Sequence, residues 1–297
     1  MKELLILSGK GGTGKTTVTG ALAAIVTSKV MADCDVDAAD LHLILQPRDS
    51  EEHEFWCGVE ARIDPQRCTG CGTCFDLCRF KAIEMADKAR LLPFACEGCG
   101  VCAHFCPEGA INMVDKLSGS WFVSTTDQGP LLHARLGVGE ENSGKLVSLV
   151  KRKARELAAS QGVQWLLVDG PPGLACPAIA ALAQVHTALL VTEPTLSGLH
   201  DLQRLAELTA HFRVPTAVCL NKWDLHPEQT REITEFCRRQ QLPLVGKIPF
   251  DRAVVDAIVQ GLPLPVHAPN APATMAIEQM WATLQPYLEQ KELRTIN

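Results

Sequence analysis

A glycine-rich turn near the amino terminus constrains the fold of this chain more than any other segment. Residues 9–17 read GKGGTGKTT and fit the pattern G-x-x-x-x-G-K-[ST] from Gly9 onward. An apolar run over residues 4–7 precedes the turn, and an alanine-rich segment of helical length over residues 16–28 follows it. A strand, turn and helix in this order predict a phosphate-binding loop, because the backbone N–H groups and the positive helix end face the same anion.

The side chains of this loop suit a nucleotide with its magnesium ion. Lys15 can reach the β- and γ-phosphates, and the Thr16 hydroxyl can bind Mg²⁺. The residues of the loop that we expect to bind the nucleotide are Gly9, Gly11, Gly12, Thr13, Gly14, Lys15, Thr16 and Thr17.

Apolar runs and helical segments alternate along most of the remaining chain. We expect strands over residues 30–32, 121–124, 165–168, 188–192, 216–220 and 244–248, and helices over residues 145–159, 177–184, 198–212, 228–239 and 252–260. This alternation predicts a doubly wound α/β domain, with a mostly parallel sheet and helices on both faces. Ligands of such sheets bind at the carboxyl ends of the strands.

Polar motifs follow three of these expected strands. The segment 33–37 reads DCDVD, and its carboxylates can position Mg²⁺-bound waters and orient an attacking water. Asp37 and Asp40 have a simpler interpretation as caps of the next helix. The segment 169–173 reads DGPPG, and the segment 221–224 reads NKWD, which by itself matches the guanine signature NKxD.

A second lysine, Lys10, identifies a family resemblance. The loop resembles the deviant Walker A signature KGGxGKTT of the MinD/Mrp/ParA superfamily, which includes the nitrogenase iron protein. The resemblance covers the α/β part of the chain and implies a P-loop NTPase fold of the SIMIBI/MinD type. It also implies ATP and Mg²⁺ as ligands, slow ATP hydrolysis stimulated by a partner, and an ATP-dependent homodimer or paralogous heterodimer. In that family the early lysine reaches the nucleotide of the other subunit.

The same resemblance implies roles for the polar motifs. Asp35 would position water in switch I, and Asp169 would hold Mg²⁺ through a water in switch II. Gly173 would offer its N–H to the γ-phosphate. Asn221 would contact adenine, with a later loop near Pro249 and Asp251 closing the base pocket, while Asp224 keeps GTP open as an alternative. The expected catalytic residues are Lys10, Lys15, Asp35 and Asp169.

The strand–helix alternation stops between about Glu51 and Ser120, where Gly, Pro and Cys dominate. We expect a small α+β domain over residues 53–119, inserted into an ATPase domain made of residues 1–52 and 120–297. The chain has 13 cysteines, of which eight lie between Cys68 and Cys106.

Those eight cysteines form two runs with the spacing C-x₂-C-x₂-C-x₃-C, which is typical of bacterial two-cluster ferredoxins. Because the fourth cysteine of each run binds the other cluster, we expect two 4Fe–4S clusters. The ligand sets are Cys68, Cys71, Cys74 and Cys106 for the first, and Cys96, Cys99, Cys102 and Cys78 for the second. Zinc is the structural alternative, although zinc sites usually use paired CxxC units separated by longer loops. Pro107 follows Cys106, as the ferredoxin pattern requires, whereas Arg79 follows Cys78.

The other five cysteines are scattered. Cys219 and Cys237 fall in an apolar strand and a helix, so we expect them to be buried as small hydrophobic residues. Cys34 and Cys57 have no assigned role. Cys176 lies seven residues after Asp169, which is the spacing of a cluster-ligating cysteine in the nitrogenase iron protein; the alternative is an ordinary thiol at a helix start.

Composition excludes several classes of protein. The 28 Lys and Arg against 34 Asp and Glu give a net charge of −6, which predicts no nucleic-acid binding. The chain shows no signal-peptide pattern and no long apolar span, so a cytoplasmic location is expected. The segment 280–291 lacks a basic face and contains Pro286, which we expect to interrupt it, so no membrane anchor is predicted. The basic segment 151–155 predicts a solvated helix face.

Three functions fit this combination of an ATPase with clusters. The first is the assembly or delivery of iron–sulfur or metal clusters to an acceptor protein. The second is ATP-gated electron transfer to a redox partner, as in the nitrogenase iron protein. The third is a positioning ATPase of the ParA/MinD type whose clusters are structural. In the first two, nucleotide-dependent movement of the switch segments would act on the inserted domain.

Overall fold

The computed structural model describes residues 1–140 and 143–292, and this part of the chain forms two compact units. Unit 1 comprises Met1–Glu52, Trp121–Arg135 and Ser143–Asn297, and unit 2 comprises His53–Ser120 and Leu136–Asn142. The second segment of unit 2 was not part of the expected insertion. The chain leaves unit 1 within one strand, β3 (Asp49–Ile63), and returns within another, β6 (Ile111–Thr126).

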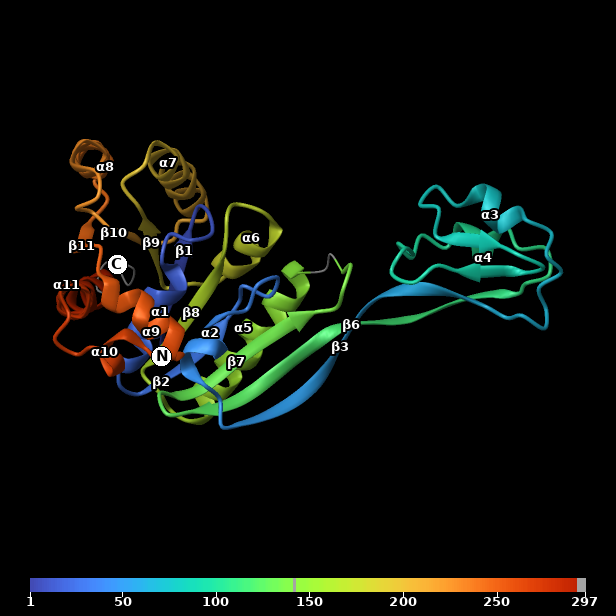
Figure 1. Ribbon diagram of the computed structural model, residues 1–297, viewed down its shortest axis with the longest axis horizontal. Helices are drawn as coiled ribbons and strands as arrows, with labels where there is room; N and C mark the ends of the chain where they lie inside the picture. The colour runs from blue at the N-terminus through green and yellow to red at the C-terminus, as the bar shows by residue number, and fades with distance from the viewer. Residues whose placement is uncertain (141–142, 293–297) are drawn as a thin grey trace. The chain divides into compact units, whose positions relative to one another are not determined.

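A nine-stranded sheet organises unit 1, in the order β11-β10-β9-β1-β8-β2-β7-β6-β3 (Figure 1). Its first six strands pair in parallel, and β2 also pairs in parallel with β7. The strands are β1 (Lys2–Ser8), β2 (Lys29–Asp33), β7 (Gly129–Leu136), β8 (Trp165–Pro172), β9 (Thr187–Thr192), β10 (Thr216–Asn221) and β11 (Leu244–Ile248). The predicted fold class, a mostly parallel α/β sheet with helices, is confirmed.

Helices cover the sheet because alternate side chains of each central strand face opposite sides. Leu4 and Ile6 of β1 belong to a core shared with α1 (Lys15–Ile25), α10 (Leu264–His267) and α11 (Pro272–Glu292). α5 (Ser143–Ser160) packs on β2 and β8, beside α6 (Cys176–Leu182). The other helices are α2 (Leu41–Leu45), α7 (Leu196–His211), α8 (Pro227–Arg239) and α9 (Arg252–Gln260).

A hairpin that the sequence pattern did not indicate completes the sheet. The predicted strand over residues 121–124 is the end of the much longer β6, and a turn at Asp127–Gln128 leads into β7. The Thr126 hydroxyl closes this turn by donating to the Gly129 carbonyl and accepting from the Gln128 N–H. β7 has no clean alternation, because Leu131, Leu132, His133 and Ala134 are all buried.

Helix α11 corrects the expected break at Pro286. The helix runs from Pro272 to Glu292 with Pro286 inside it. Proline removes one helical hydrogen bond, but Leu284 and Leu288 are buried on either side of it. Packing of these two side chains on the core holds the helix together across the proline. Within the described residues, no helix is both long and apolar enough to cross a membrane.

The basic segment of α5 is a second correction, because it is not a uniformly solvated face. Lys151 is 2% exposed, and its Nζ lies 2.9 Å from Glu3 Oε1 and 3.0 Å from the Ala183 carbonyl oxygen. It also donates to the Ala181 carbonyl. Arg155 pairs with the other oxygen of Glu3 at 2.7 Å. These contacts fasten α5 and the end of α6 to the start of β1.

Replacing Lys151 with alanine is expected to destabilise unit 1 by about 3 kcal/mol, because it leaves a buried carboxylate short of a cationic partner. The urea midpoint of unfolding should fall accordingly. Lys153→Ala is the matched control, since Lys153 pairs with Glu156 at the surface. Its effect should stay below about 1 kcal/mol. Equal midpoints for the two variants would show that the Glu3–Lys151 contact contributes nothing.

Unit 2 is built around cysteines. It contains two short helices, α3 (Thr73–Leu77) and α4 (Val101–His104), and an antiparallel pair, β4 (Ile83–Met85) and β5 (Ala89–Leu91). α3 and α4 contact each other. The small core consists of Ala61, Cys74, Ile83, Ala89 and Ile111, with Cys68, Cys78, Cys96, Cys102 and Cys106 packed against it. Several large apolar side chains of this unit, among them Phe75, Phe80, Phe94 and Phe105, are exposed, whereas five of its cysteines pack against the core.

Candidate functional site

The glycine-rich turn joins β1 to α1 with the backbone conformation that its sequence requires. Gly14 caps α1 with φ 95°, in the left-handed region that favours glycine. A Cβ at this position would lie 2.3 Å from Asn221 Nδ2. The Asn221 amide donates to the Thr13 carbonyl at 2.8 Å, so the end of β10 is fastened to the turn. Gly9, at the start of the turn, packs closely against Asp201 of α7.

Lys15, Thr16 and Asp169 meet beneath the turn. Lys15 Nζ lies 3.0 Å from Asp169 Oδ1, and the Thr16 hydroxyl donates to Asp169 Oδ2 at 2.8 Å. Thr19, one turn later in α1, donates to Asp169 Oδ1 at 2.8 Å. Lys15 is 6% exposed. Burial lowers its pKa, but the attraction of Asp169, Asp33 and Asp35 outweighs burial and raises the pKa overall, so Lys15 carries a positive charge.

Two carboxylates from the loop after β2 approach this cluster. Asp35 Oδ2 lies 3.6 Å from Lys15 Nζ. Burial raises the pKa of Asp35 to about 6, against the opposing effect of Lys15. Asp33 is fully buried. Its pKa is raised mainly by burial and, to a lesser extent, by repulsion from the charge of Asp169.

Asp33 has a structural role that the sequence did not indicate. Its two oxygens accept hydrogen bonds of 3.0 Å from the N–H groups of Asp35 and Leu41. Leu41 is the first residue of α2, so Asp33 supplies the cap that was expected from Asp37 or Asp40. Asp40 occupies the N-cap position but makes no side-chain cap bond. Asp33 thus shapes the loop that carries Asp35.

Lys10 is held by residues that follow β9. Its Nζ lies 2.7 Å from Glu193 Oε1 and donates to the Ser197 hydroxyl at 3.0 Å. Glu193 Oε2 also lies 3.4 Å from Lys222 Nζ, which in turn donates to the Gly12 carbonyl at 3.2 Å. Neither Glu193 nor Lys222 was among the expected site residues. Their contact with Lys10 and the turn depends on two strands far away in the sequence.

The remaining residues that were expected to contact the nucleotide make hydrogen bonds with backbone groups of the protein in this structure. The Gly173 N–H donates to the Ser8 carbonyl at 2.9 Å. Asp224 Oδ1 accepts from the Phe250 N–H at 2.7 Å, next to Pro249 at the end of β11. Asp251 caps α9 by accepting from the Ala253 N–H at 2.9 Å. The NKWD segment therefore connects the phosphate turn to the loop of Pro249, and its role in base recognition stays a prediction.

A cavity of about 1160 Å³, including its open mouth, lies over the turn. Lys10 to Thr17 line it, together with Asp35 and Asp40 from the segment after β2. Leu43, Ile44 and Ile258 supply an apolar wall. The lining thus combines the backbone N–H groups of the turn with apolar side chains, which suits a ligand that has both an anionic and an apolar part.

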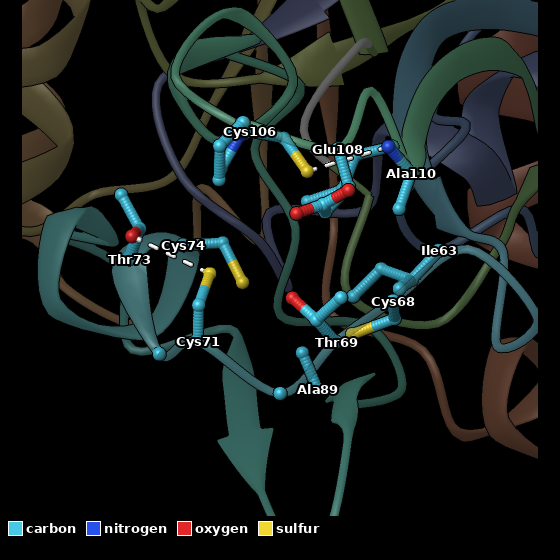
Figure 2. A pocket seen from close by; sticks show the side chains of 14 residues that line it. Ile63, Cys68, Thr69, Cys71, Thr73, Cys74, Ala89, Cys106, Glu108 and Ala110 are labelled. Carbon is cyan, nitrogen blue, oxygen red and sulfur yellow. Dashed lines mark hydrogen bonds between the residues drawn. The ribbon is translucent and has the colours of Figure 1, made fainter.

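Unit 2 contains two cysteine pockets of about 350 Å³ each, including their open mouths. Four cysteines line each of them, three from one run and one from the other. The first pocket is lined by Cys68, Cys71, Cys74 and Cys106, and the second by Cys96, Cys99, Cys102 and Cys78. Figure 2 shows the sulfur atoms of the first set facing a common space. The structure therefore brings together the same two groups of cysteines that the spacing predicts.

Hydrogen bonds to sulfur repeat in the two runs. The Ala82 N–H donates to Cys78 Sγ and the Ala110 N–H donates to Cys106 Sγ, both at 3.3 Å. Cys71 Sγ lies 3.5 Å from the Thr73 hydroxyl. Among residues 1–140 and 143–292, no group of three or more His, Cys, Asp or Glu side chains is arranged to hold a metal ion.

The other five cysteines line neither pocket. Cys219 and Cys237 are buried, as predicted, and burial raises their pKa values to about 12 and about 11. Cys34 and Cys57 are buried too, and burial raises the pKa of Cys34. Cys176 is exposed and is the first residue of α6, next to Gly144 of α5.

Comparison with known proteins identifies the family. The model described as "CobQ/CobB/MinD/ParA nucleotide binding domain" matches residues 4–264. The chain belongs to this family. It is therefore a nucleotide-binding protein of the MinD/ParA type, and MinD/ParA proteins are ATPases.

Relatives of this MinD/ParA-type protein occur in archaea and plants. The uncharacterized protein MJ0578 of Methanocaldococcus jannaschii is 36% identical over 223 residues, which cover 74% of this chain and 78% of that protein. A chloroplastic septum site-determining protein minD homolog of Arabidopsis thaliana is 24% identical over 93% of this chain and 72% of its own. The cell division ATPase MinD of Pyrococcus furiosus has a similar fold, with a TM-score of 0.57, 20% identity, and coverage of 96% of this chain and 99% of that chain.

Proposed function

We propose that this protein is a Mg²⁺-dependent ATPase whose second unit holds two 4Fe–4S clusters, and that it acts in the assembly or delivery of iron–sulfur or metal clusters. The single observation that carries the proposal is the pair of four-cysteine pockets in unit 2. The phosphate turn of unit 1 supplies the ATPase part.

The cysteine pockets fit clusters better than single zinc ions. A zinc ion would draw four sulfur atoms to about 2.3 Å from one point. In a 4Fe–4S cluster each thiolate binds a different iron, so the four sulfurs need not converge on a single point. The four cysteines that line each pocket, three from one run and one from the other, support a cluster at both sites. Such clusters supply one-electron chemistry.

The residues of unit 1 fit MgATP. Mg²⁺ is usually held by one or two protein oxygens together with phosphates and waters. Thr16 and Asp169, 2.8 Å apart, offer such a pair of oxygens. Lys15 would neutralise charge on the phosphates, and Asp35 would orient the attacking water. We assign ATP as the nucleotide, with GTP as the alternative left open by Asp224.

Electron transfer is the second candidate function. It is favoured by the complete four-thiol sets and by the backbone N–H bonds to Cys78 and Cys106, which suit clusters that stay in place. A cluster that is delivered must instead leave its ligands. In either case we propose an ATP-dependent homodimer or paralogous heterodimer, a protein acceptor or redox partner, and a cytoplasmic location, where thiols stay reduced.

One experiment separates these functions. The protein is reconstituted with iron and sulfide, and cluster transfer to an apo-acceptor and cluster reduction are each measured with and without MgATP. ATP-dependent transfer supports assembly or delivery, and ATP-dependent reduction or oxidation supports electron transfer. If MgATP changes neither rate, both coupled functions are wrong, and a positioning ATPase with structural clusters takes their place.

The pKa of Asp35 gives a prediction for pH dependence. Because this pKa is raised to about 6, Asp35 is charged above that pH and neutral below it. Only the charged carboxylate accepts a proton or orients water fully, so ATPase activity should fall as the pH decreases through about 6. Asp35→Asn should lose most of the activity, and the remainder should lack this decline. Asp37→Asn, at an exposed position of the same loop, should keep it. A decline that persists in Asp35→Asn would assign it to another group.

A further inference from the structure

Glu193 lies between two lysines at the edge of the phosphate turn. It directly follows β9, and its carboxylate is mostly buried, with 16% of the side chain exposed. One oxygen lies 2.7 Å from Lys10 Nζ, and the other lies 3.4 Å from Lys222 Nζ. One carboxylate therefore neutralises part of the charge of two ammonium groups.

Both lysines belong to the phosphate site by position. Lys10 is the second residue of the turn and lines the cavity above it. Lys222 donates to the Gly12 carbonyl inside the turn at 3.2 Å. An anion in the cavity would attract both ammonium groups, and Glu193 would compete with it for them.

The surrounding backbone is shaped to hold this arrangement. Lys222 has φ 56°, which is uncommon for a residue with a side chain. Its N–H donates a hydrogen bond of 3.0 Å to Asn221 Oδ1. On the other side, Ser197 accepts a second hydrogen bond from Lys10 at 3.0 Å. Burial raises the pKa of Glu193, but Lys10 and Lys222 lower it more, so the carboxylate is charged.

We propose that Glu193 is a positioning residue of the ATPase site, which fixes Lys10 and Lys222 beside the phosphate turn and competes with the nucleotide for their charge. The inference rests on the proposed ATPase function. It predicts opposite effects on binding and turnover when the carboxylate is removed. Binding should become tighter because two ammonium groups are released toward the phosphates. Turnover should become slower because Lys10 is no longer fixed.

The test compares Glu193→Gln with the wild type by calorimetry with MgADP and by steady-state ATP hydrolysis. We expect about fivefold tighter MgADP binding, a steeper loss of affinity with salt, and a kcat lower by about fivefold or more. Glu193→Asp keeps the charge and should recover most of the wild-type values. Glu235→Gln is the matched control, because Glu235 pairs with Arg238 on the exposed face of α8.

The outcomes distinguish this inference from the function on which it rests. If the wild type binds no nucleotide, the proposed ATPase function is wrong. The inference is then wrong as well, because it rests on that function. If the wild type binds MgADP and Glu193→Gln matches it in affinity and kcat, the positioning role alone is wrong. Weaker binding together with a lower melting temperature would also overturn it, since that result describes a purely structural contact.

Discussion

Replacing Lys15 with alanine is expected to lower the kcat for ATP hydrolysis by about 100-fold or more, and to weaken MgATP binding. Lys15 is the cation that the turn, Asp169 and Asp35 surround, with Asp169 at 3.0 Å. Without it, the β- and γ-phosphates lose the charge that would stabilise the transition state. Hydrolysis is measured by phosphate release, and binding by calorimetry.

Loss of fold must be separated from loss of chemistry in this variant. Removing Lys15 leaves Asp33 and Asp169 buried without their cation, so some loss of stability is expected. The melting temperature of Lys15→Ala is therefore measured beside its activity. Lys247→Ala, an exposed lysine of β11, is the control and should hydrolyse ATP normally. A folded Lys15→Ala that hydrolyses ATP at the wild-type rate would refute the assignment of the site.

Replacing the four cysteines of one pocket with serine is expected to halve the iron bound by the reconstituted protein. One such variant changes Cys68, Cys71, Cys74 and Cys106, and the other changes Cys78, Cys96, Cys99 and Cys102. Each should lose one cluster and keep the other, because the two sets line separate pockets. Iron and sulfide analysis and the electron paramagnetic resonance spectrum of the reduced protein measure the result.

A third variant tests the exchange of fourth ligands between the runs. It changes the contiguous run Cys68, Cys71, Cys74 and Cys78, and so removes three ligands from one pocket and one from the other. It should retain less iron than either pocket variant. If it instead keeps half of the iron while the pocket variants lose all of it, each run binds its own cluster and the pairing is wrong. Cys176→Ser is expected to keep all the iron. Loss of iron from this variant would show that the exposed thiol at the start of α6 binds a cluster of its own.

The features that could be predicted from the sequence are those formed within short segments. Strand, turn and helix around Gly14 follow from neighbouring residues, and the three cysteines of each run are close in sequence. The apolar runs of the central strands predict a parallel sheet for the same reason. The break expected at Pro286 was wrong, because burial of Leu284 and Leu288 outweighs one missing hydrogen bond. The strand β7 could not be predicted, because its residues do not alternate between polar and apolar.

The phosphate turn, the α/β class and the grouping of eight cysteines follow from the pattern of residues along the chain. The charged side chains that surround the turn do not, because folding brings them there from strands and helices far apart in the sequence. Asp33 as the cap of α2, Glu193 between Lys10 and Lys222, and Lys151 buried against Glu3 all depend on side chains from different strands and helices. The free energy of a charged side chain depends on its burial and its partners, and folding brings both from distant parts of the chain.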